Sequence, residues 1–264
     1  MKEIKLESIA PPATIQAWYR KQIYAMISDI RANIKKDIVL RYESDIAMDG
    51  VIDWIGHIMD SIVSKWQKNL DTLSTDIATD FARRTQTNYD KRLQKILKKR
   101  GFAVNFRYSS QVAEQTQIVI GENVSLIKSI GNQYLDNVRA AVWRSVKGGY
   151  DTQGLIKQLM DIDGVTERRA KIIAKDQIAK ANQAFERSRA EELGITHADW
   201  VHSSAGRTFR HDHVKANGTR YEIAKGCYIS GEFIQPAEKI NCRCRARLII
   251  EIPESMVDSP IKSL

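Results

Sequence analysis

The residues best suited to metal or acid–base chemistry lie near the end of the chain. They are the histidines His211 and His213 and all three cysteines of the sequence, Cys227, Cys242 and Cys244. Thiolate and imidazole groups are the usual ligands of tetrahedral zinc. One interpretation is therefore a zinc site in which the three cysteines are joined by one histidine, for which we take His213.

The segment from Asn241 to Ile250 allows a second interpretation. If it is a β-strand, its small and apolar side chains share one face and its arginines share the other. The first face comprises Cys242, Cys244, Ala246 and Leu248. A free cysteine packs like a small hydrophobic residue, so the sulfurs would lie in the core of a small module. Cys-x-Cys also differs from the Cys-x2-Cys spacing of many structural zinc sites. Both interpretations stay open.

A hydrolytic metal site would make further demands. His211 and His213 share a face if they lie in an extended segment, but a metal-dependent hydrolase also needs a carboxylate as general base. Asp212 would point to the opposite side of such a segment. We therefore expect no catalytic residues and a protein that is not an enzyme.

Five arginines lie in or beside these motifs: Arg207, Arg210, Arg243, Arg245 and Arg247. Guanidinium groups bind phosphate oxygens without reading bases, so these side chains could form a ridge that contacts nucleic acid. The whole chain has 41 Lys and Arg against 32 Asp and Glu, a net charge of +9. A phosphate polymer or an acidic protein surface suits that charge. The alternatives are a solvated sheet face and a basic helical protein without such a partner.

Helical spacing of apolar residues dominates the first three quarters of the chain. We expect helices over residues 15–40, 51–98, 111–146, 151–160 and 166–193, the second of them as one helix or a pair. Residues 102–110 should form a loop or short strand. Gly164 separates the last two helices, with Thr166 as N-cap, and Gly194 follows the final helix as its C′ residue.

The composition changes after Gly194, where alternation replaces helical spacing. We expect a helical region over residues 1–194, a small β-containing module over 195–251 and an extended tail over 252–264. The fold class is mainly α, with long amphipathic helices followed by a small C-terminal α+β module. The sequence lacks a secretory signal and an apolar stretch of about 18 residues, so we expect a soluble protein that is not exported.

The order of several motifs resembles a known family. Arg210-x-x-His213 is followed by Gly218, by Gly231-Glu-Phe-Ile-Gln-Pro236 and by Ile240-Asn-Cys-Arg-Cys244. Upstream stand Glu122-Asn123 with Leu126-Ile127, and Ala170-x-x-Ile173-Ala174-Lys-Asp176-Gln177. Over roughly 140 residues this order resembles the phage head-morphogenesis proteins, minor capsid proteins that include the Mu F-like proteins. Lys175-Asp176-Gln177 departs from the family's usual Arg-Thr-Glu, and Phe209 stands within its usual Arg-Thr-Arg run.

The resemblance implies a minor head protein of a tailed phage that acts in procapsid assembly. The partners it implies are the portal protein, the major capsid or scaffold proteins, and double-stranded DNA during packaging or ejection, with no membrane. The location it implies is the virion, in the head interior or at the portal vertex, after assembly in the host cytoplasm. The residues alone leave one alternative, a zinc-dependent nucleic-acid-binding protein or nuclease.

Overall fold

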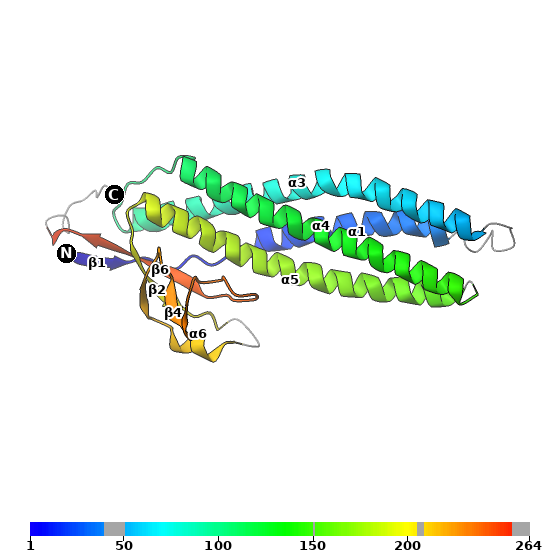
Figure 1. The fold of residues 1–264 in the computed structure, drawn as a ribbon. Coiled ribbons are helices and arrows are strands. Elements are labelled where there is room, and N and C mark those ends of the chain that lie inside the picture. The colour runs from blue at the N-terminus through cyan, green and yellow to red at the C-terminus, as the bar shows by residue number, and fades with distance from the viewer. Residues whose placement is uncertain (40–50, 150, 205–208, 255–264) are drawn as a thin grey trace. The chain divides into compact units, whose positions relative to one another are not determined.

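The computed structural model describes residues 1–39, 51–149, 151–204 and 209–254. Long helices make up most of them (Figure 1). The helices are α1 (Ala13–Ile34), which continues into the π-helical segment η1 (Lys35–Val39), α3 (Val51–Lys99), α4 (Ser110–Lys147) and α5 (Thr152–Glu192). The chain divides into two compact units. Unit 1 comprises Met1–Gln16, Asp80–Val119 and Lys175–Leu264, and unit 2 comprises Ala17–Thr79 and Ile120–Ala174.

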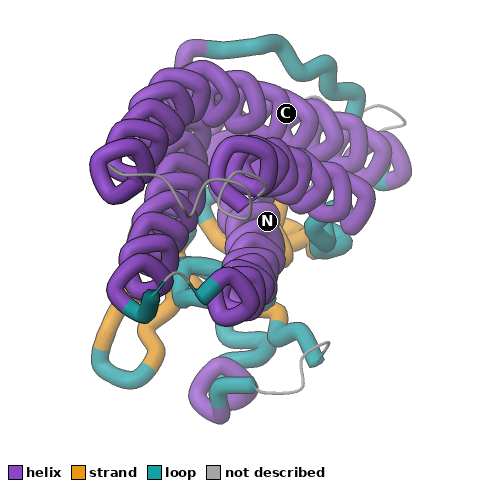
Figure 2. Tube along the Cα trace, turned by 90° about the vertical axis from the view of Figure 1, so that its right-hand side faces the viewer, coloured by secondary structure: helices purple, strands orange, loops and turns teal. Residues whose placement is uncertain are grey.

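Unit 2 is a bundle of segments from α1, α3, α4 and α5, which lie side by side in both views (Figures 1 and 2). Apolar residues at helical spacing form its core, as in α1, which buries Ile23, Ile27 and Ile30. Polar contacts also join the helices. The Tyr19 hydroxyl donates to Asn123 Oδ1 at 2.7 Å, and Lys128 pairs with Asp71 at 2.6 Å.

Unit 1 is built around a four-stranded antiparallel sheet. Its strand order is β1 (Lys2–Lys5), β6 (Arg245–Ile252), β2 (His197–Val201) and β3 (Arg220–Glu222). The short helix α6 (His211–Lys215) precedes β3, and a hairpin pairs β4 (Cys227–Ile229) with β5 (Glu232–Ile234). Most residues of α5 from 176 to 190 are buried. A helix that is buried on nearly all sides belongs to the core, so this half of α5 is the core helix of unit 1.

Helix α5 is continuous where the sequence predicts two helices. Gly164 lies within it, and Thr166, predicted as an N-cap, donates its hydroxyl to the Ile162 carbonyl at 2.8 Å. A glycine inside a helix costs only about 1 kcal/mol relative to alanine. Leu155 and Ala170 are fully buried on either side of it, and this burial offsets that cost. The prediction of a helix break was therefore wrong.

The predicted end of α5 is confirmed. Gly194 has a φ of +66°, and the amide of Ile195 donates to the Ala190 carbonyl at 2.8 Å. This bond and the positive φ are those of a Schellman motif, which glycine favours because it has no Cβ. The fold class is also confirmed, since long helices precede a small antiparallel sheet.

The two units do not follow the boundaries expected from the sequence. Gly194 does end the last long helix, but unit 1 combines the strands with the N-terminal residues and with parts of α3, α4 and α5. Strand β1 was not predicted, and Ile252, expected in the tail, belongs to β6. Residues 255–264 of that tail lie outside the described residues.

Among the described helices, none combines the length and the apolar character that a bilayer crossing requires.

Candidate functional site

Three of the predicted metal-binding side chains lie together in unit 1. His213 Nδ1 is 3.4 Å from Cys242 Sγ and 3.6 Å from Cys244 Sγ. The three potential ligand atoms lie within 4.8 Å of one another, and all three residues are buried. We name this group the His–Cys–Cys cluster. Its imidazole and sulfur atoms are of the types that bind zinc.

Helix α5 positions the cysteine segment through two hydrogen bonds. The amide of Asn241 donates to Asp176 Oδ1 at 2.6 Å, and the amide of Ala246 donates to Gln183 Oε1 at 3.1 Å. These bonds hold the backbone on both sides of the two cysteines. Asn241 has a φ of +60°, in the left-handed region that Asn tolerates better than most residues. Asp176, where the chain departs from the family motif, therefore holds the cysteine segment in place.

His213 is held from two sides. Its ring meets the ring of Trp200 edge to face, with centroids 5.2 Å apart and an interplanar angle of 89°. The preceding Asp212 accepts hydrogen bonds from the Ser230 hydroxyl and from the His213 amide, both at 2.9 Å. The hydrogen bond from Ser230 lowers the pKa of Asp212. This carboxylate therefore serves as an anchor for the short helix α6.

The two cysteines of the cluster shift each other's pKa in opposite directions. The hydrogen bond with the Cys244 thiol lowers the pKa of Cys242 to about 5, although burial opposes this effect. The same hydrogen bond, with burial, raises the pKa of Cys244. Burial raises the pKa of Cys227 as well. A thiolate is the form of cysteine that binds metals, and the lowered pKa favours that form at Cys242.

Cys227, the fourth predicted ligand, does not join the cluster. It is buried in β4, where it pairs with Ile234 of β5. The strand predicted from Asn241 begins at Arg245 instead, because residues 241–244 form a turn and an irregular segment. The predicted alternation of burial is confirmed over Cys242, Cys244, Ala246 and Leu248, whereas Arg243, Arg245 and Arg247 are half-buried or exposed.

A histidine that no sequence motif points to lies beside the cluster. His202 follows β2, and its Nδ1 is 3.7 Å from Cys244 Sγ. Its amide donates to Asn217 Oδ1 at 2.9 Å, which fixes its backbone. The segment with His211 and His213, considered above as extended, forms the helix α6. His211 is exposed at the start of this helix. No spacing rule connects His202 to the Cys-x-Cys motif, so only the fold reveals the contact.

The structure describes four of the five arginines of the predicted ridge. Arg207 lies outside the described residues, and Arg247 is exposed on β6. Arg210 donates to the Ile240 carbonyl at 3.2 Å. The His–Cys–Cys cluster, Lys175, Arg210 and Arg243 line a common pocket of about 520 Å³. Basic side chains thus lie around the cluster, and the role of these arginines in nucleic-acid binding stays a prediction.

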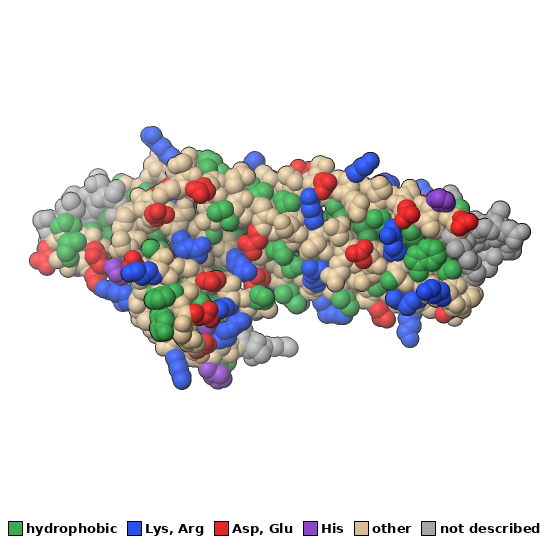
Figure 3. Space-filling model, in the orientation of Figure 1, with side chains coloured by type: hydrophobic (Ala, Val, Ile, Leu, Met, Phe, Trp, Pro, Cys, Tyr) green, Lys and Arg blue, Asp and Glu red, His purple; other side chains and the backbone are tan. Residues whose placement is uncertain are grey.

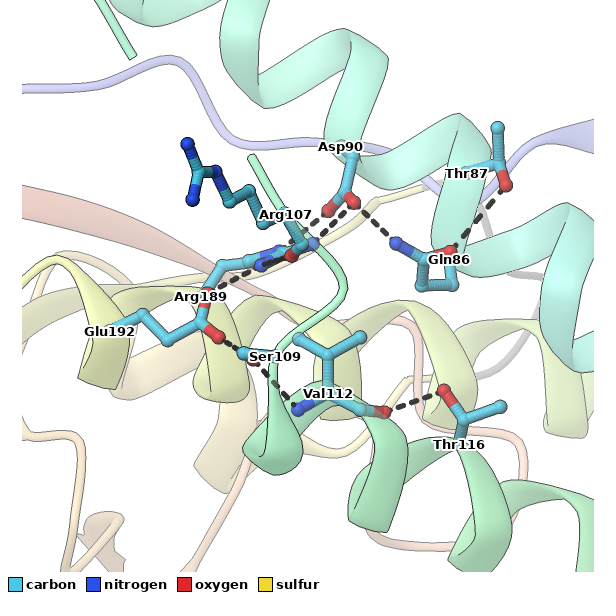
Figure 4. Close-up of polar contacts among 9 residues, drawn as sticks. All are labelled: Gln86, Thr87, Asp90, Arg107, Ser109, Val112, Thr116, Arg189 and Glu192. Atoms are coloured by element: carbon cyan, nitrogen blue, oxygen red, sulfur yellow. Dashed lines mark hydrogen bonds and ion pairs between the residues drawn. The ribbon is translucent and has the colours of Figure 1, made fainter. Parts of the chain in front are cut away.

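A second buried polar group lies in unit 1, and the sequence does not predict it (Figure 4). Arg189 of α5 donates from Nε and Nη2 to the two oxygens of Asp90 in α3, at 2.8 and 2.6 Å. Its Nη1 donates to the Arg107 carbonyl at 3.0 Å and pairs with Glu192. Glu192 in turn accepts a hydrogen bond from Ser109, the N-cap of α4. One guanidinium thus joins α3, the loop before α4, and α5.

Residues 136–247 match the family described as phage Mu protein F like protein. This part of the chain is a Mu F-like segment. The Mu F-like segment runs from α4 to β6, so it contains the His–Cys–Cys cluster, Asp176 and Arg189. The match confirms the resemblance to the phage head-morphogenesis proteins over this part of the chain.

One relative matches nearly the whole chain. An uncharacterized protein of Haemophilus influenzae is 27 % identical over 266 residues, a match that covers 98 % of this chain and 59 % of the relative. The chain therefore spans less than two thirds of the length of that relative. No solved structure matches the chain. The Mu F-like segment is accordingly the part for which the comparisons indicate a function.

Proposed function

We propose that this chain is a minor head protein of a tailed phage that acts in procapsid assembly at the portal. The observation that carries the proposal is the Mu F-like segment, residues 136–247. A helical bundle such as unit 2 also suits a docking role, because a helix can bury one face on a partner and keep a charged face in solvent. The proposed location is the portal vertex or the head interior.

The half of α5 in unit 2 offers an apolar surface to such a partner. Val165 and Ile172 are 54 % and 48 % exposed, although both side chains are apolar. They are seven residues apart, so they lie on one face of the helix. Arg168 and Lys171 are exposed on the same stretch. Exposed apolar side chains with a charged rim are typical of protein-binding surfaces, and we assign contact with the portal protein to this face.

Replacing Val165 and Ile172 together with serine is expected to weaken binding to purified portal oligomers about tenfold or more. Each side chain would otherwise contribute on the order of 1 kcal/mol by burial at the interface. The matched control replaces Tyr228 and Phe233, which are 64 % and 59 % exposed on the β4–β5 hairpin of unit 1. Portal affinity that falls in the control pair and not in the α5 pair would show that the helical unit is not the docking surface.

The end of α3 carries a surface suited to DNA phosphates. Lys91, Lys95 and Lys98 are exposed and line a groove of about 780 Å³ with the chain from Gly101 to Asn105. Spacings of four and three residues place the three ammonium groups on one face of the helix. On the face shown in Figure 3, basic and acidic side chains are interspersed, so the net charge alone does not locate a DNA surface. We infer that this groove contacts packaged DNA.

Replacing these three lysines with glutamine should weaken binding to double-stranded DNA and reduce its salt dependence. Each lost phosphate contact makes the slope of log K against log salt shallower by about 0.9, so the slope of the triple variant should be shallower by about 2 to 3. A matched triple variant replaces Lys68, Lys147 and Lys157, which are exposed in unit 2. An equal loss of slope in both variants, measured by titration at several salt concentrations, would argue against a DNA contact at this groove.

A zinc-dependent nucleic-acid-binding protein or nuclease is the second candidate, because basic side chains line a pocket with the His–Cys–Cys cluster. Hydrolysis would need a carboxylate placed to act as general base. Asp212 accepts two hydrogen bonds that anchor α6. Asp176 accepts the Asn241 amide and pairs with Lys180 at 3.1 Å. These structural roles of the two carboxylates favour the assembly function.

A further inference from the structure

We propose that the His–Cys–Cys cluster is a structural zinc site and that His202 is its fourth ligand. The ligands would be two sulfurs, from Cys242 and Cys244, and two imidazole nitrogens, from His202 and His213. The proposal does not depend on contact with the portal or with DNA, because it concerns how unit 1 holds its own segments together.

Three of the distances between the potential ligand atoms fit a tetrahedral ion. Zinc binds sulfur at about 2.3 Å and nitrogen at about 2.0–2.1 Å, so a sulfur and a nitrogen on one tetrahedral ion lie about 3.6 Å apart. The separations from His213 Nδ1 to the two sulfurs are 3.4 and 3.6 Å, and the separation from His202 Nδ1 to Cys244 Sγ is 3.7 Å. Both imidazoles therefore present a ring nitrogen to a sulfur at this spacing. His202 lies outside the group of three whose ligand atoms are all within 4.8 Å of one another, so its side chain would have to move toward Cys242 and His213 to complete the site.

Apolar packing alone does not account for this arrangement. Cys227 shows what a cysteine in an apolar core looks like, since it is fully buried and pairs with Ile234. Cys242 and Cys244 instead face the Nδ1 atom of His213, and Cys244 also faces that of His202. Buried groups that carry charge are paired or coordinate metals. A Zn²⁺ ion bound by two thiolates and two neutral imidazoles leaves no net charge in the buried cluster.

A zinc ion at this place would connect segments that have little regular structure of their own. His202 follows β2, His213 lies in the five-residue helix α6, and the cysteines precede β6. The strands β3, β4 and β5 that lie between them have three residues each. Because the unfolded chain has no preformed site, the free energy of metal binding adds to the free energy of folding. The ion would thus stabilise the part of unit 1 with the shortest elements.

The test is metal analysis of the full chain, purified under reducing conditions without a chelator. We expect one zinc per chain, and we expect the zinc-free protein to bind Co²⁺ with the charge-transfer absorption of thiolate ligands. Cys242→Ser and His213→Gln should each abolish stoichiometric binding. Cys227→Ala is the matched control, because this cysteine is equally buried and lies outside the cluster, and it should keep one zinc per chain.

His202→Gln tests the fourth ligand. It should weaken zinc binding about tenfold or more while the thiolate absorption of Co²⁺ is retained, and an unchanged affinity would overturn the assignment of His202.

A wild-type chain that takes up neither zinc nor cobalt would overturn the site, and so would a Cys227→Ala variant that loses metal as fully as Cys242→Ser. Because a variant could fail to fold, the wild type is also melted with and without chelator. Its Tm should fall on chelation and recover with one equivalent of zinc, and an unchanged Tm would contradict a structural role.

Discussion

Replacement of Arg189 by methionine is expected to lower the free energy of unfolding by about 3–5 kcal/mol. The side chain is 2 % exposed, and its guanidinium bonds Asp90 at two oxygens, the Arg107 carbonyl and Glu192. Methionine would fill much of the volume, but it would leave the mostly buried carboxylates of Asp90 and Glu192 without their guanidinium partner. The Phe106 ring, whose centroid is 4.7 Å from the guanidinium carbon, would lose a cation–π contact as well.

Chemical unfolding followed by circular dichroism measures this loss. Arg220→Met is the matched control, because Arg220 also pairs with a carboxylate, that of Glu3, but both side chains are about two-fifths exposed. Exposed ion pairs contribute about 0–1 kcal/mol, so the control should lose no more than that. Arg189→Lys should lie between the two, since lysine cannot form the paired bonds to Asp90. Equal losses for Arg189→Met and Arg220→Met would contradict the assignment of a supporting role to the buried guanidinium.

A large loss of stability between pH 5 and pH 9 is expected from Glu186. Its carboxyl group is buried, and Gln183 Nε2 donates to its Oε2 at 2.6 Å. Burial raises the pKa of Glu186 from 4.5 to about 8, and the Gln183 hydrogen bond and the nearby Arg245 and Arg187 oppose this effect only in part. In the unfolded chain the pKa returns to its ordinary value. At a pH between the two pKa values, the folded state therefore holds a proton that the unfolded state has lost. The stability contributed by the neutral carboxyl is therefore fully present below about pH 4.5 and is lost as the pH rises through about 8.

Glu186→Gln should remove this pH dependence, because an amide stays neutral and keeps a similar shape. The wild type should lose on the order of 4 kcal/mol more than the variant between pH 5 and pH 9. Groups that titrate in both proteins cancel in that comparison of unfolding free energies. Glu114→Gln, at an exposed position of the same unit, should follow the wild type. Parallel pH curves for wild type and Glu186→Gln would show that the buried carboxyl stays ionised in the folded protein.

Local patterns suffice for much of the fold. The long helices follow from apolar residues at helical spacing, and the end of α5 follows from Gly194, whose positive φ favours glycine. Strand β1 does not follow, because it has four residues and its pairing with β6 joins the two ends of the described chain. The continuity of α5 through Gly164 also depends on tertiary burial, which a local break signal does not contain.

The residue types of the candidate site were predictable from the sequence, but which of these residues contact one another was only partly predictable. His213, Cys242 and Cys244 are selected by their chemistry and do lie together. Cys227 was selected for the same reason, but the β4–β5 hairpin keeps it out of the cluster, and His202 lies beside Cys244 instead. Contacts between residues far apart in sequence decide such choices. The pair Arg189 and Asp90, 99 residues apart, escaped prediction for the same reason.

Sedimentation with procapsids tests the proposed assembly at the portal most directly. Purified chain is mixed with procapsids assembled with the portal protein and with procapsids assembled without it, and the bound fraction is measured after centrifugation. The chain should co-sediment with the portal-containing procapsids and stay in the supernatant with the others. Co-sedimentation with neither kind, or equally with both, would contradict a role at the portal.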